Sequence, residues 1–271
     1  MSTFLSILAA INFATAGATT VPADIAWVAE GGFCEPETVL PLPDNTLLVS
    51  NVCDFRKTGT GFLTLLSAQG ETLDWKIVDG LDSPLGMAML DGSVYLVDNN
   101  RLKVFRWPEY ELLKTVDLET SVANDIAVSS QGVVYVTDSG KHQVIRLMPD
   151  GSQSVLTGQA RFKNANGIAI DHDQLYVGGE RLWRVNLVNG SVETVGPEWI
   201  SDIDGIEFEA NGTIQVTPVA GPLIRYRSNS DIEVLSGEGI SSANHGWAEN
   251  LKLALVPTGF DNKVIAIRIS N

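Results

Sequence analysis

The sequence predicts an all-β protein, a six-bladed β-propeller with four-stranded blades, and this prediction depends on two observations. A strand-like hydrophobic run occurs six times, at residues 47–51, 94–98, 134–138, 175–179, 214–218 and 253–257. The runs begin at intervals of about forty residues, which is the length of one four-stranded propeller blade. Because a single blade cannot bury both of its faces, successive blades are expected to form one closed unit.

A strand near the start of the chain is expected to close the ring. Residues 25–29 have the pattern of this strand and are predicted to pair with the last strand, at 264–269. Such pairing removes the open sheet edge. Further strands are predicted at residues 63–66, 102–106, 144–147, 182–186 and 224–227. Clusters of Gly, Asn and Asp separate these strands. Because the blades are expected to form one closed unit, residues 19–271 are predicted to be a single propeller domain.

A polar residue lies shortly before five of the six runs. Glu37, Asn124, Asn166, Asp204 and Asn244 occupy this position, whereas the second blade has a Pro-Leu pair there. Equivalent positions of successive blades are related by rotation about the central channel. If the position lies at the inner end of the innermost strand, these side chains form a ring that points at the axis.

The predicted ring suits a metal ion. Glu37 and Asp204 offer carboxylates, while Asn124 and Asn166 offer amide oxygens. Hard oxygen ligands without Cys or paired His suit Ca²⁺ best, with Mg²⁺ and Mn²⁺ as alternatives. Water or substrate would complete the coordination shell, as a catalytic metal requires. The alternative is that these residues form turns, in which Asn and Asp are common, but their recurrence at one phase of the repeat favours the metal site.

Composition narrows the choice of partner. The chain has 271 residues, of which 44% are hydrophobic, and a formal net charge of −15. Such a surface repels nucleic acid. The expected partner is a small-molecule substrate, and we expect a monomer. No segment after the amino terminus approaches the length of about 18 consecutive apolar residues that a membrane span needs.

The amino-terminal segment predicts export. Residues 4–18 are apolar and small, and they resemble a secretory signal peptide, although no Lys or Arg precedes Arg56. Residues 14–16 and 16–18 both match the small-residue pattern of a cleavage site. We therefore expect residues 1–18 to be a signal peptide and the protein to be secreted or periplasmic.

The two cysteines, Cys34 and Cys53, are predicted to form a disulfide. If the strands that flank them form a tight hairpin centred between Pro43 and Asp44, the two residues lie opposite each other. Cross-strand neighbours have Cβ atoms about 4.5–5.5 Å apart, close to what a disulfide needs. A disulfide also fits an exported protein. Two buried free thiols are the alternative.

Short phrases follow one another along the chain in a fairly specific order. They are Pro-Glu-Thr-Val at 36–39, Val-Ser-Asn-Val at 49–52, Asn-Asp-Ile-Ala at 124–127, Thr-Asp-Ser at 137–139, Asn-Gly-Ile at 166–168, Asp-Gly-Ile at 204–206, Val-Pro-Thr at 256–258 and Asn-Lys-Val at 262–264. In this order they resemble the propeller family of regucalcin (senescence marker protein), gluconolactonase and luciferin-regenerating enzyme. Diisopropyl-fluorophosphatase is a more distant relative. The resemblance spans residues 28–270.

This resemblance implies one divalent metal, usually calcium, in the channel of a six-bladed propeller. It implies Glu37, Asn124, Asn166 and Asp204 as ligands, and hydrolysis of a lactone or related ester with Asp204 as base or nucleophile. The chain departs from the better-characterised members in two places. No arginine corresponds to their sugar-lactone contacts, and the sixth blade has Asn-His-Gly-Trp at 244–247 where many bacterial relatives have an acidic residue. Both departures argue against a sugar lactone.

Four further residues are candidates for the site. His245 lies near a ring position and is a candidate general base, with a hydrogen-bonded structural role as the alternative. Asn244, Asp125 and Trp247 are expected to line the substrate pocket, although Trp247 also fits a core position.

Two other classes of function stay open. One is a non-catalytic propeller that binds or scaffolds a partner, because a fold does not determine an activity. The other is an enzyme of natural-product cyclisation or condensation. Relatives of that second class do not depend on a ring of metal ligands, so the four oxygen donors favour the hydrolase.

Overall fold

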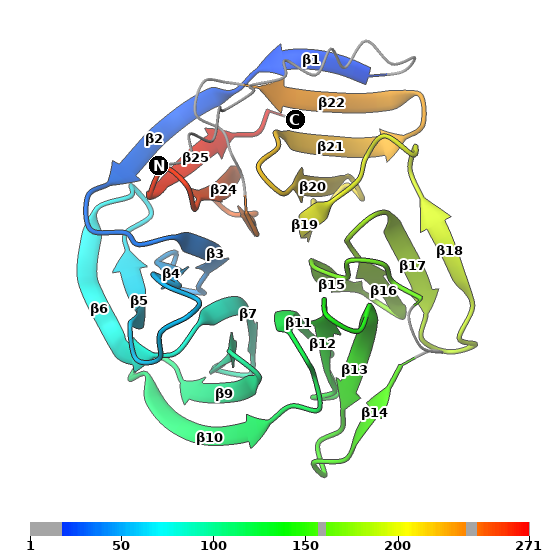
Figure 1. The fold of residues 1–271 in the computed structure, drawn as a ribbon. Helices are drawn as coiled ribbons and strands as arrows, with labels where there is room; N and C mark the ends of the chain where they lie inside the picture. The colour runs from blue at the N-terminus through cyan, green and yellow to red at the C-terminus, as the bar shows by residue number, and fades with distance from the viewer. Residues whose placement is uncertain (1–17, 157–160, 237–242, 271) are drawn as a thin grey trace, which may run out of the picture.

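In the computed structural model, six antiparallel blades surround a central channel (Figure 1). The structure describes residues 18–156, 161–236 and 243–270. The predicted signal peptide, apart from Ala18, lies outside the described residues. The predicted six-bladed β-propeller is confirmed, and most of its blades have four strands. No helix in the described ranges is long and apolar enough to cross a membrane.

Each repeated run belongs to the second strand of its blade. These strands are β4 (Leu47–Asn51), β8 (Ser93–Asp98), β12 (Val134–Asp138), β16 (Gln174–Val177), β20 (Ile214–Pro218) and β24 (Leu253–Thr258). The phrases before the runs lie in or next to the innermost strands, as predicted. These are β3 (Pro36–Pro41), β7 (Pro84–Leu90), β11 (Ala123–Val128), β15 (Ile168–Asp171), β19 (Ile203–Phe208) and β23 (Gly246–Ala248). Neighbouring innermost strands contact one another in order around the channel.

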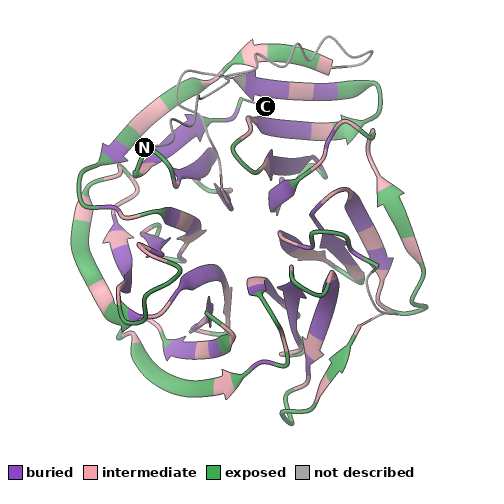
Figure 2. Cartoon of the chain, viewed as in Figure 1, coloured by how far each residue is buried: buried purple, intermediate pink, exposed green. Residues whose placement is uncertain are grey.

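The third and outer strands complete the blades. The third strands are β5 (Gly61–Leu66), β9 (Arg101–Arg106), β13 (Gln143–Leu147), β17 (Leu182–Asn186), β21 (Leu223–Ser228) and β25 (Lys263–Arg268). The outer strands are β6 (Thr72–Leu81), β10 (Glu111–Asp117), β14 (Gln153–Val155), β18 (Val192–Val195), β22 (Asp231–Ser236) and β2 (Asp24–Glu30). The second strands are largely buried and most outer strands are exposed (Figure 2), because neighbouring blades cover the inner strands on both faces.

The amino-terminal strands close the ring. β2 pairs antiparallel with β25, with Ala29 opposite Val264, so the predicted closure is confirmed. The sequence analysis did not predict β1 (Ala18–Pro22), which pairs in parallel with β22 as a fifth strand of the fifth blade. One continuous segment thus joins the fifth blade to the sixth, and it leaves no unpaired β22 edge.

The innermost strands of four blades carry a register shift at the same phase of the repeat. The shifts lie between Pro36 and Val39, Pro84 and Met87, Ala123 and Ile126, and Ile203 and Gly205. A β-bulge bends its strand and redirects the side chain at the bulge. Three predicted metal ligands, Glu37, Asn124 and Asp204, lie inside these shifts, so the bulge sets the direction of each donor.

Glycine occurs where the inner strands of neighbouring blades come closest. A Cβ atom on Gly167 would lie 1.8 Å from the backbone oxygen of Asp204 in the next blade. A Cβ atom on Gly205 would lie 2.5 Å from Nδ1 of His245, again in the next blade. The Asn-Gly and Asp-Gly phrases are therefore needed for blade packing as well as for presenting a polar side chain.

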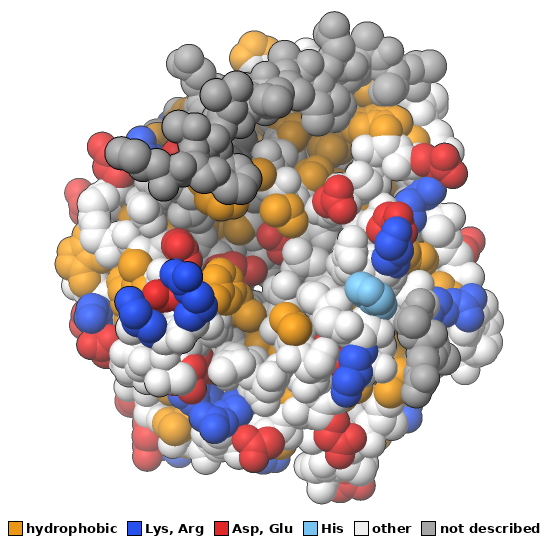
Figure 3. Space-filling view, in the orientation of Figure 1, with side chains coloured by type: hydrophobic (Ala, Val, Ile, Leu, Met, Phe, Trp, Pro, Cys, Tyr) orange, Lys and Arg blue, Asp and Glu red, His pale blue; other side chains and the backbone are white. Residues whose placement is uncertain are grey.

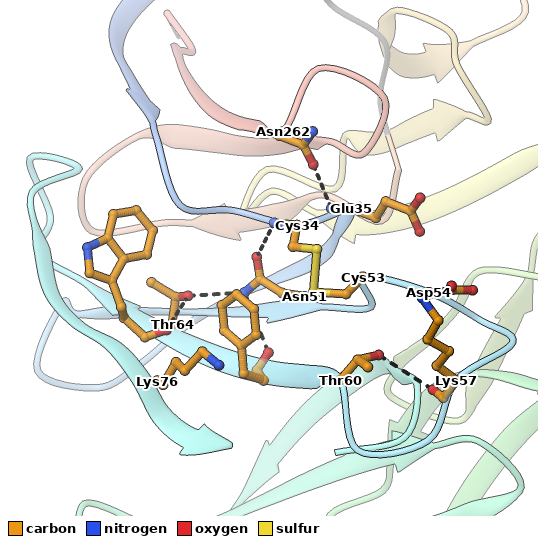
Figure 4. The surroundings of a disulfide bond; sticks show 12 residues. Cys34, Glu35, Asn51, Cys53, Asp54, Lys57, Thr60, Thr64, Lys76 and Asn262 are labelled. Atoms are coloured by element: carbon orange, nitrogen blue, oxygen red, sulfur yellow. Dashed lines mark hydrogen bonds and ion pairs between the residues drawn. A yellow bond between two sulfur atoms is a disulfide. The ribbon is translucent and has the colours of Figure 1, made fainter. Parts of the chain in front are cut away.

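The predicted disulfide joins Cys34 to Cys53, with a Cα–Cα distance of 4.6 Å (Figure 4). The predicted hairpin register is wrong next to the turn, where Val39 pairs with Val49. The bulge that contains Glu37 then shifts the pairing by one residue, so that Pro36 lies opposite Asn51. This second register brings the two cysteines together. The backbone N–H of Cys34 also donates to Oδ1 of Asn51, at 3.1 Å.

Removing the disulfide is expected to lower the stability of the first blade. The double variant Cys34→Ser/Cys53→Ser opens a loop of 19 residues, and such a loop corresponds to about 3 kcal/mol of unfolding free energy. In a domain of this size the melting temperature should fall by about 6–12 °C, measured by calorimetry in oxidising buffer. Reduced wild-type protein should have the same melting temperature as the variant. Equal melting temperatures for oxidised wild type and variant would show that the bridge adds no stability.

Candidate active site

Four predicted donors meet in one cavity at the mouth of the channel. This mouth cavity has a volume of about 380 Å³, and its lining includes Glu37, Asn124, Asn166 and Asp204. They come from the first, third, fourth and fifth blades, so residues far apart in the sequence converge as the repeat predicts. Figure 3 shows the central hollow on this face of the molecule. Leu85 of the second blade also lines the cavity and contributes no donor.

Hydroxyl groups on the second strands hold the bulged segments in place. Oγ of Ser50 accepts a hydrogen bond from the N–H of Thr38, next to Glu37, at 3.0 Å. Oγ1 of Thr137 accepts from the N–H of Asp125 at 2.9 Å, and Oγ1 of Thr217 accepts from the N–H of Gly205 at 3.1 Å. The bulge takes these N–H groups out of the ladder, and a buried amide without a partner is costly. Ser50, Thr137 and Thr217 therefore stabilise the bulged segments that carry Glu37, Asn124 and Asp204.

Acids at the ends of two second strands have a structural role. Oδ1 of Asp98 accepts from the N–H groups of Asp82 and Ser83. Asp138 likewise accepts from the N–H groups of Ser121 and Val122. Both carboxylates are buried and bind turn amides, which agrees with the preference of Asp for such turns.

Three of the converging oxygens have no protein partner. Oδ1 of Asn124, Oδ1 of Asn166 and Oδ1 of Asp204 are buried and accept no hydrogen bond. Asn124 instead donates through Nδ2 to Oγ of Ser139, at 3.3 Å. Buried acceptors of this kind are rare because desolvation without a bond is unfavourable. Three such oxygens in one cavity are free to accept a cation, so the donor set fits the divalent ion that the sequence predicts.

The donor set consists of two carboxylates and two amides rather than a cluster of acids. Within the described ranges, no group of three or more His, Cys, Asp or Glu side chains is arranged to hold a metal. Amide oxygens are ordinary calcium ligands and poor ligands for softer metals. The composition of the set therefore favours Ca²⁺ over zinc or copper.

Burial makes the two carboxylates of the set difficult to ionise. It raises the pKa of Asp204 to about 7, although a hydrogen bond from the Asn166 side chain lowers it. Burial also raises the pKa of Glu37 well above its usual value, and the charges of Asp204 and Asp125 raise it further. Oε2 of Glu37 accepts a hydrogen bond from Oγ1 of Thr38, at 2.6 Å. A nearby positive charge would restore both groups to their ionised form.

A second cavity, of about 310 Å³, continues along the innermost strands. This channel cavity is lined by Asp125, Asn244, His245 and Glu207 among other residues. Burial raises the pKa of Asp125 and of Glu207 to about 8 each. Asn244 and Asp125, which were predicted for the substrate pocket, thus line the channel cavity and not the mouth cavity. Asp125 accepts hydrogen bonds from the N–H groups of Ile126 and Ile168, which tie two blades together.

His245 and Trp247 also lie away from the mouth cavity. His245 is buried, its Nδ1 lies 3.0 Å from Oγ1 of Thr217, and burial lowers its pKa to about 3. Such a ring is a weak proton acceptor at neutral pH. Trp247 packs in a hydrophobic cluster with Leu223 and Ile265, and its Nε1 donates to Glu249. The core alternative for Trp247 therefore agrees with its position.

Sequence reasoning missed several residues of the two cavities. Phe55, Val122 and Val219 line the mouth cavity from loops, and loop side chains follow no strand period that could identify them. Glu207 lies three residues after Asp204 on β19. Because strand side chains alternate and the register shifts between Ile203 and Gly205, counting from Asp204 would not have indicated that Glu207 lines the channel.

Comparison with known proteins supports the architecture. The family model described as NHL repeat matches residues 120–147, which include β12 and β13 of the third blade. The chain matches no curated protein sequence.

Solved structures of similar shape include enzymes. A putative gluconolactonase matches with a TM-score of 0.69 and 17% identity, over 91% of this chain and 91% of the other. Virginiamycin B lyase from Staphylococcus aureus matches with a TM-score of 0.63 and 10% identity, over 90% of this chain and 99% of the other. A streptogramin B lyase matches with a TM-score of 0.62 and 13% identity, over 90% and 98%. At these identities the likeness shows a shared propeller fold.

Calcium is expected to stabilise the protein, and more so at pH 8 than at pH 5. The raised pKa of Asp204, about 7, means that the folded chelated protein holds a proton that the unfolded chain has released. The stability of the chelated protein should therefore fall as the pH rises from about 4 to 7. Ca²⁺ at 100 times its Kd adds about 2.7 kcal/mol, which corresponds to a rise in melting temperature of about 5–10 °C.

The measurement is calorimetry with chelator and with Ca²⁺ at both pH values. Asp204→Asn removes the titrating carboxyl and should show little calcium stabilisation at either pH. Glu35→Gln changes an exposed carboxylate near Glu37 in the sequence and should behave as wild type. A calcium effect of the same size at pH 5 and pH 8 would contradict the assignment of these carboxylates to the ion.

Proposed function

We propose that this protein is a divalent-cation-dependent hydrolase of a lactone or related ester, with its reaction at the mouth cavity. One observation carries the proposal, namely the three buried side-chain oxygens of Asn124, Asn166 and Asp204 that have no partner in the protein. Buried unsatisfied groups in a cavity that also holds carboxyls of raised pKa are typical of a functional site.

Glu37, Asn124, Asn166 and Asp204 would hold the cation, with Ca²⁺ as the best match to their oxygens and Mg²⁺ or Mn²⁺ as alternatives. When bound, such a cation supplies a Lewis acid for the carbonyl group and lowers the pKa of a neighbouring carboxyl. The residues around it keep the donors in position. Thr38 fixes one oxygen of Glu37 through its hydroxyl, and Ser139 accepts a hydrogen bond from the amide of Asn124.

Asp204 is the proposed base or nucleophile. Its side chain lies in the mouth cavity, its Oδ1 has no partner, and its bulged backbone is held by the neighbouring Gly205–Thr217 hydrogen bond. Acting as a base, Asp204 takes a proton from the water whose oxygen bonds to the carbonyl carbon. The bond from that carbon to the ester oxygen then breaks, and the proton passes to the leaving oxygen. The products are a hydroxyl group and a carboxylic acid.

The protein is proposed to act on a small molecule outside the cytoplasm, as a monomer. The Cys34–Cys53 disulfide supports this location, because such bonds persist in oxidising compartments. The cavity of about 380 Å³ has the volume of a site for a small ligand.

Turnover should depend on the cation and on the two carboxylates. Purified protein is tested on a panel of lactones and aryl esters, with Ca²⁺ and with chelator. Glu37→Gln and Asp204→Asn should each lower kcat/KM by at least a hundredfold, because each removes a charge that acts on the reacting atoms. Glu35→Gln is the matched control and should keep wild-type turnover. Full activity after complete metal removal, or in both variants, would refute the proposal.

A further inference from the structure

We propose that the mouth cavity selects a neutral lactone or ester that carries an apolar substituent, and that Phe55, Val122 and Val219 bind that substituent. This inference rests on the proposed function and names its substrate class. The three side chains come from different blades, in the β4–β5 loop, the segment before β11 and the β20–β21 turn. They therefore surround the opening above the oxygen donors.

The exposure of these side chains is the first argument. The exposed fractions are 65% for Phe55, 51% for Val122 and 49% for Val219. Leu85 and Ala123 extend the same apolar lining and are buried. Figure 3 shows hydrophobic side chains gathered around the central hollow on this face. Large apolar side chains grouped around a cavity are typical of a ligand site, whereas isolated exposed ones are ordinary.

Charge is the second argument. Among the described residues that line the mouth cavity, the charged ones are Glu37 and Asp204, both assigned to the cation. No Lys, Arg or His of the described chain joins them in that lining. Arg56 and Lys57 follow Phe55 in its loop, but both form ion pairs with Asp54. The cavity thus offers a substrate carboxylate or phosphate no cationic side chain, which favours a neutral substrate.

The polar lining is the third argument. Asn100 is used by the fold, since its Oδ1 accepts from Oγ1 of Thr120 and the N–H of Ala123. Ser121 is used as well, since its hydroxyl donates to Asp138. Outside the donor set this leaves Asn99 and Ser83, whose buried Oγ has no partner, as further polar residues of the lining. A polyhydroxylated ring carries more hydroxyl groups than these two side chains can pair, and a hydroxyl placed against an apolar side chain would lose water without gaining a partner. An alkyl or aryl group there would instead gain by leaving water.

The test compares three δ-lactones on calcium-loaded protein: one with a linear alkyl chain, the unsubstituted ring, and the polyhydroxylated ring. We expect kcat/KM for the alkyl lactone to exceed that for the polyhydroxylated one by at least tenfold. Phe55→Ser and Val219→Ser should each lower kcat/KM for the alkyl lactone by about tenfold, chiefly through KM. The loss for the unsubstituted ring should be smaller, so that the ratio of kcat/KM for the alkyl lactone to kcat/KM for the unsubstituted lactone falls in both variants.

Val188→Ser is the matched control. Val188 is 78% exposed in the β17–β18 turn and does not line the mouth cavity, so its removal should change none of these values. A higher kcat/KM for the polyhydroxylated lactone than for the alkyl lactone would overturn the inference. An unchanged ratio of kcat/KM for the alkyl lactone to kcat/KM for the unsubstituted lactone, in both Phe55→Ser and Val219→Ser, would also overturn it.

A binding measurement separates this inference from the proposed function. The probe is the lactam analogue of the alkyl lactone, which resists hydrolysis, and its affinity is measured by calorimetry with Ca²⁺ present. Binding that weakens about tenfold in Phe55→Ser supports the apolar binding site of Phe55, Val122 and Val219 even if no lactone is hydrolysed. In that case the proposed function fails while the inferred binding site stands. Absence of lactam binding, or equal lactam affinity in Phe55→Ser and wild type, would refute the proposed apolar binding site.

Discussion

Among the residues that the structure describes, four carboxyl groups share the channel of this propeller without a cationic side chain to offset them. Glu37, Asp125, Asp204 and Glu207 all have raised pKa values, and burial is the largest cause for each. None of the ion pairs among the described residues includes any of the four. Removing like charges from water and holding them together is unfavourable unless protons or a cation compensate. The channel therefore either keeps these groups protonated or binds a cation, and the proposed function requires the cation.

The repeated bulge allows close packing of the innermost strands and also directs polar side chains towards the channel. A propeller brings six strand ends to one axis, where close packing leaves room for glycine at Gly167 and Gly205 and for little else. The bulges at Glu37, Asn124 and Asp204 redirect one side chain per blade. Ser50, Thr137 and Thr217 then accept the N–H groups that these bulges free. The same few residues thus stabilise the ring and present its oxygens.

Much of this arrangement could be predicted from the sequence because it repeats. The second strands, such as β4 at Leu47–Asn51, were evident because burial on both faces demands a continuous apolar run. The four donors could be found because they keep one phase relative to those runs. The outer strands of the first five blades were missed; β10 and β18, for example, face water and carry no strong pattern. β1 was missed because a parallel partner distant in sequence leaves no local signal.

Other features could not be predicted from the repeat, because they depend on a local bulge, on loops or on tertiary packing. The cysteine pair was predicted from a hairpin register that is wrong at the turn, and the bulge at Glu37 corrects it. Phe55 and Val219 reach the mouth from loops, whose course follows from tertiary packing. His245 was predicted near the donors but lies in the channel cavity, because Gly205 allows its ring to pack beside β19.

Anomalous diffraction from crystals grown with Mn²⁺ would test the central claim most directly, since this ion scatters anomalously and accepts the same oxygen ligands. The account predicts one strong peak at the mouth of the channel, bonded to side-chain oxygens of Glu37, Asn124, Asn166 and Asp204. A map with no peak at these oxygens, or with the four side chains turned away from one another, would contradict it.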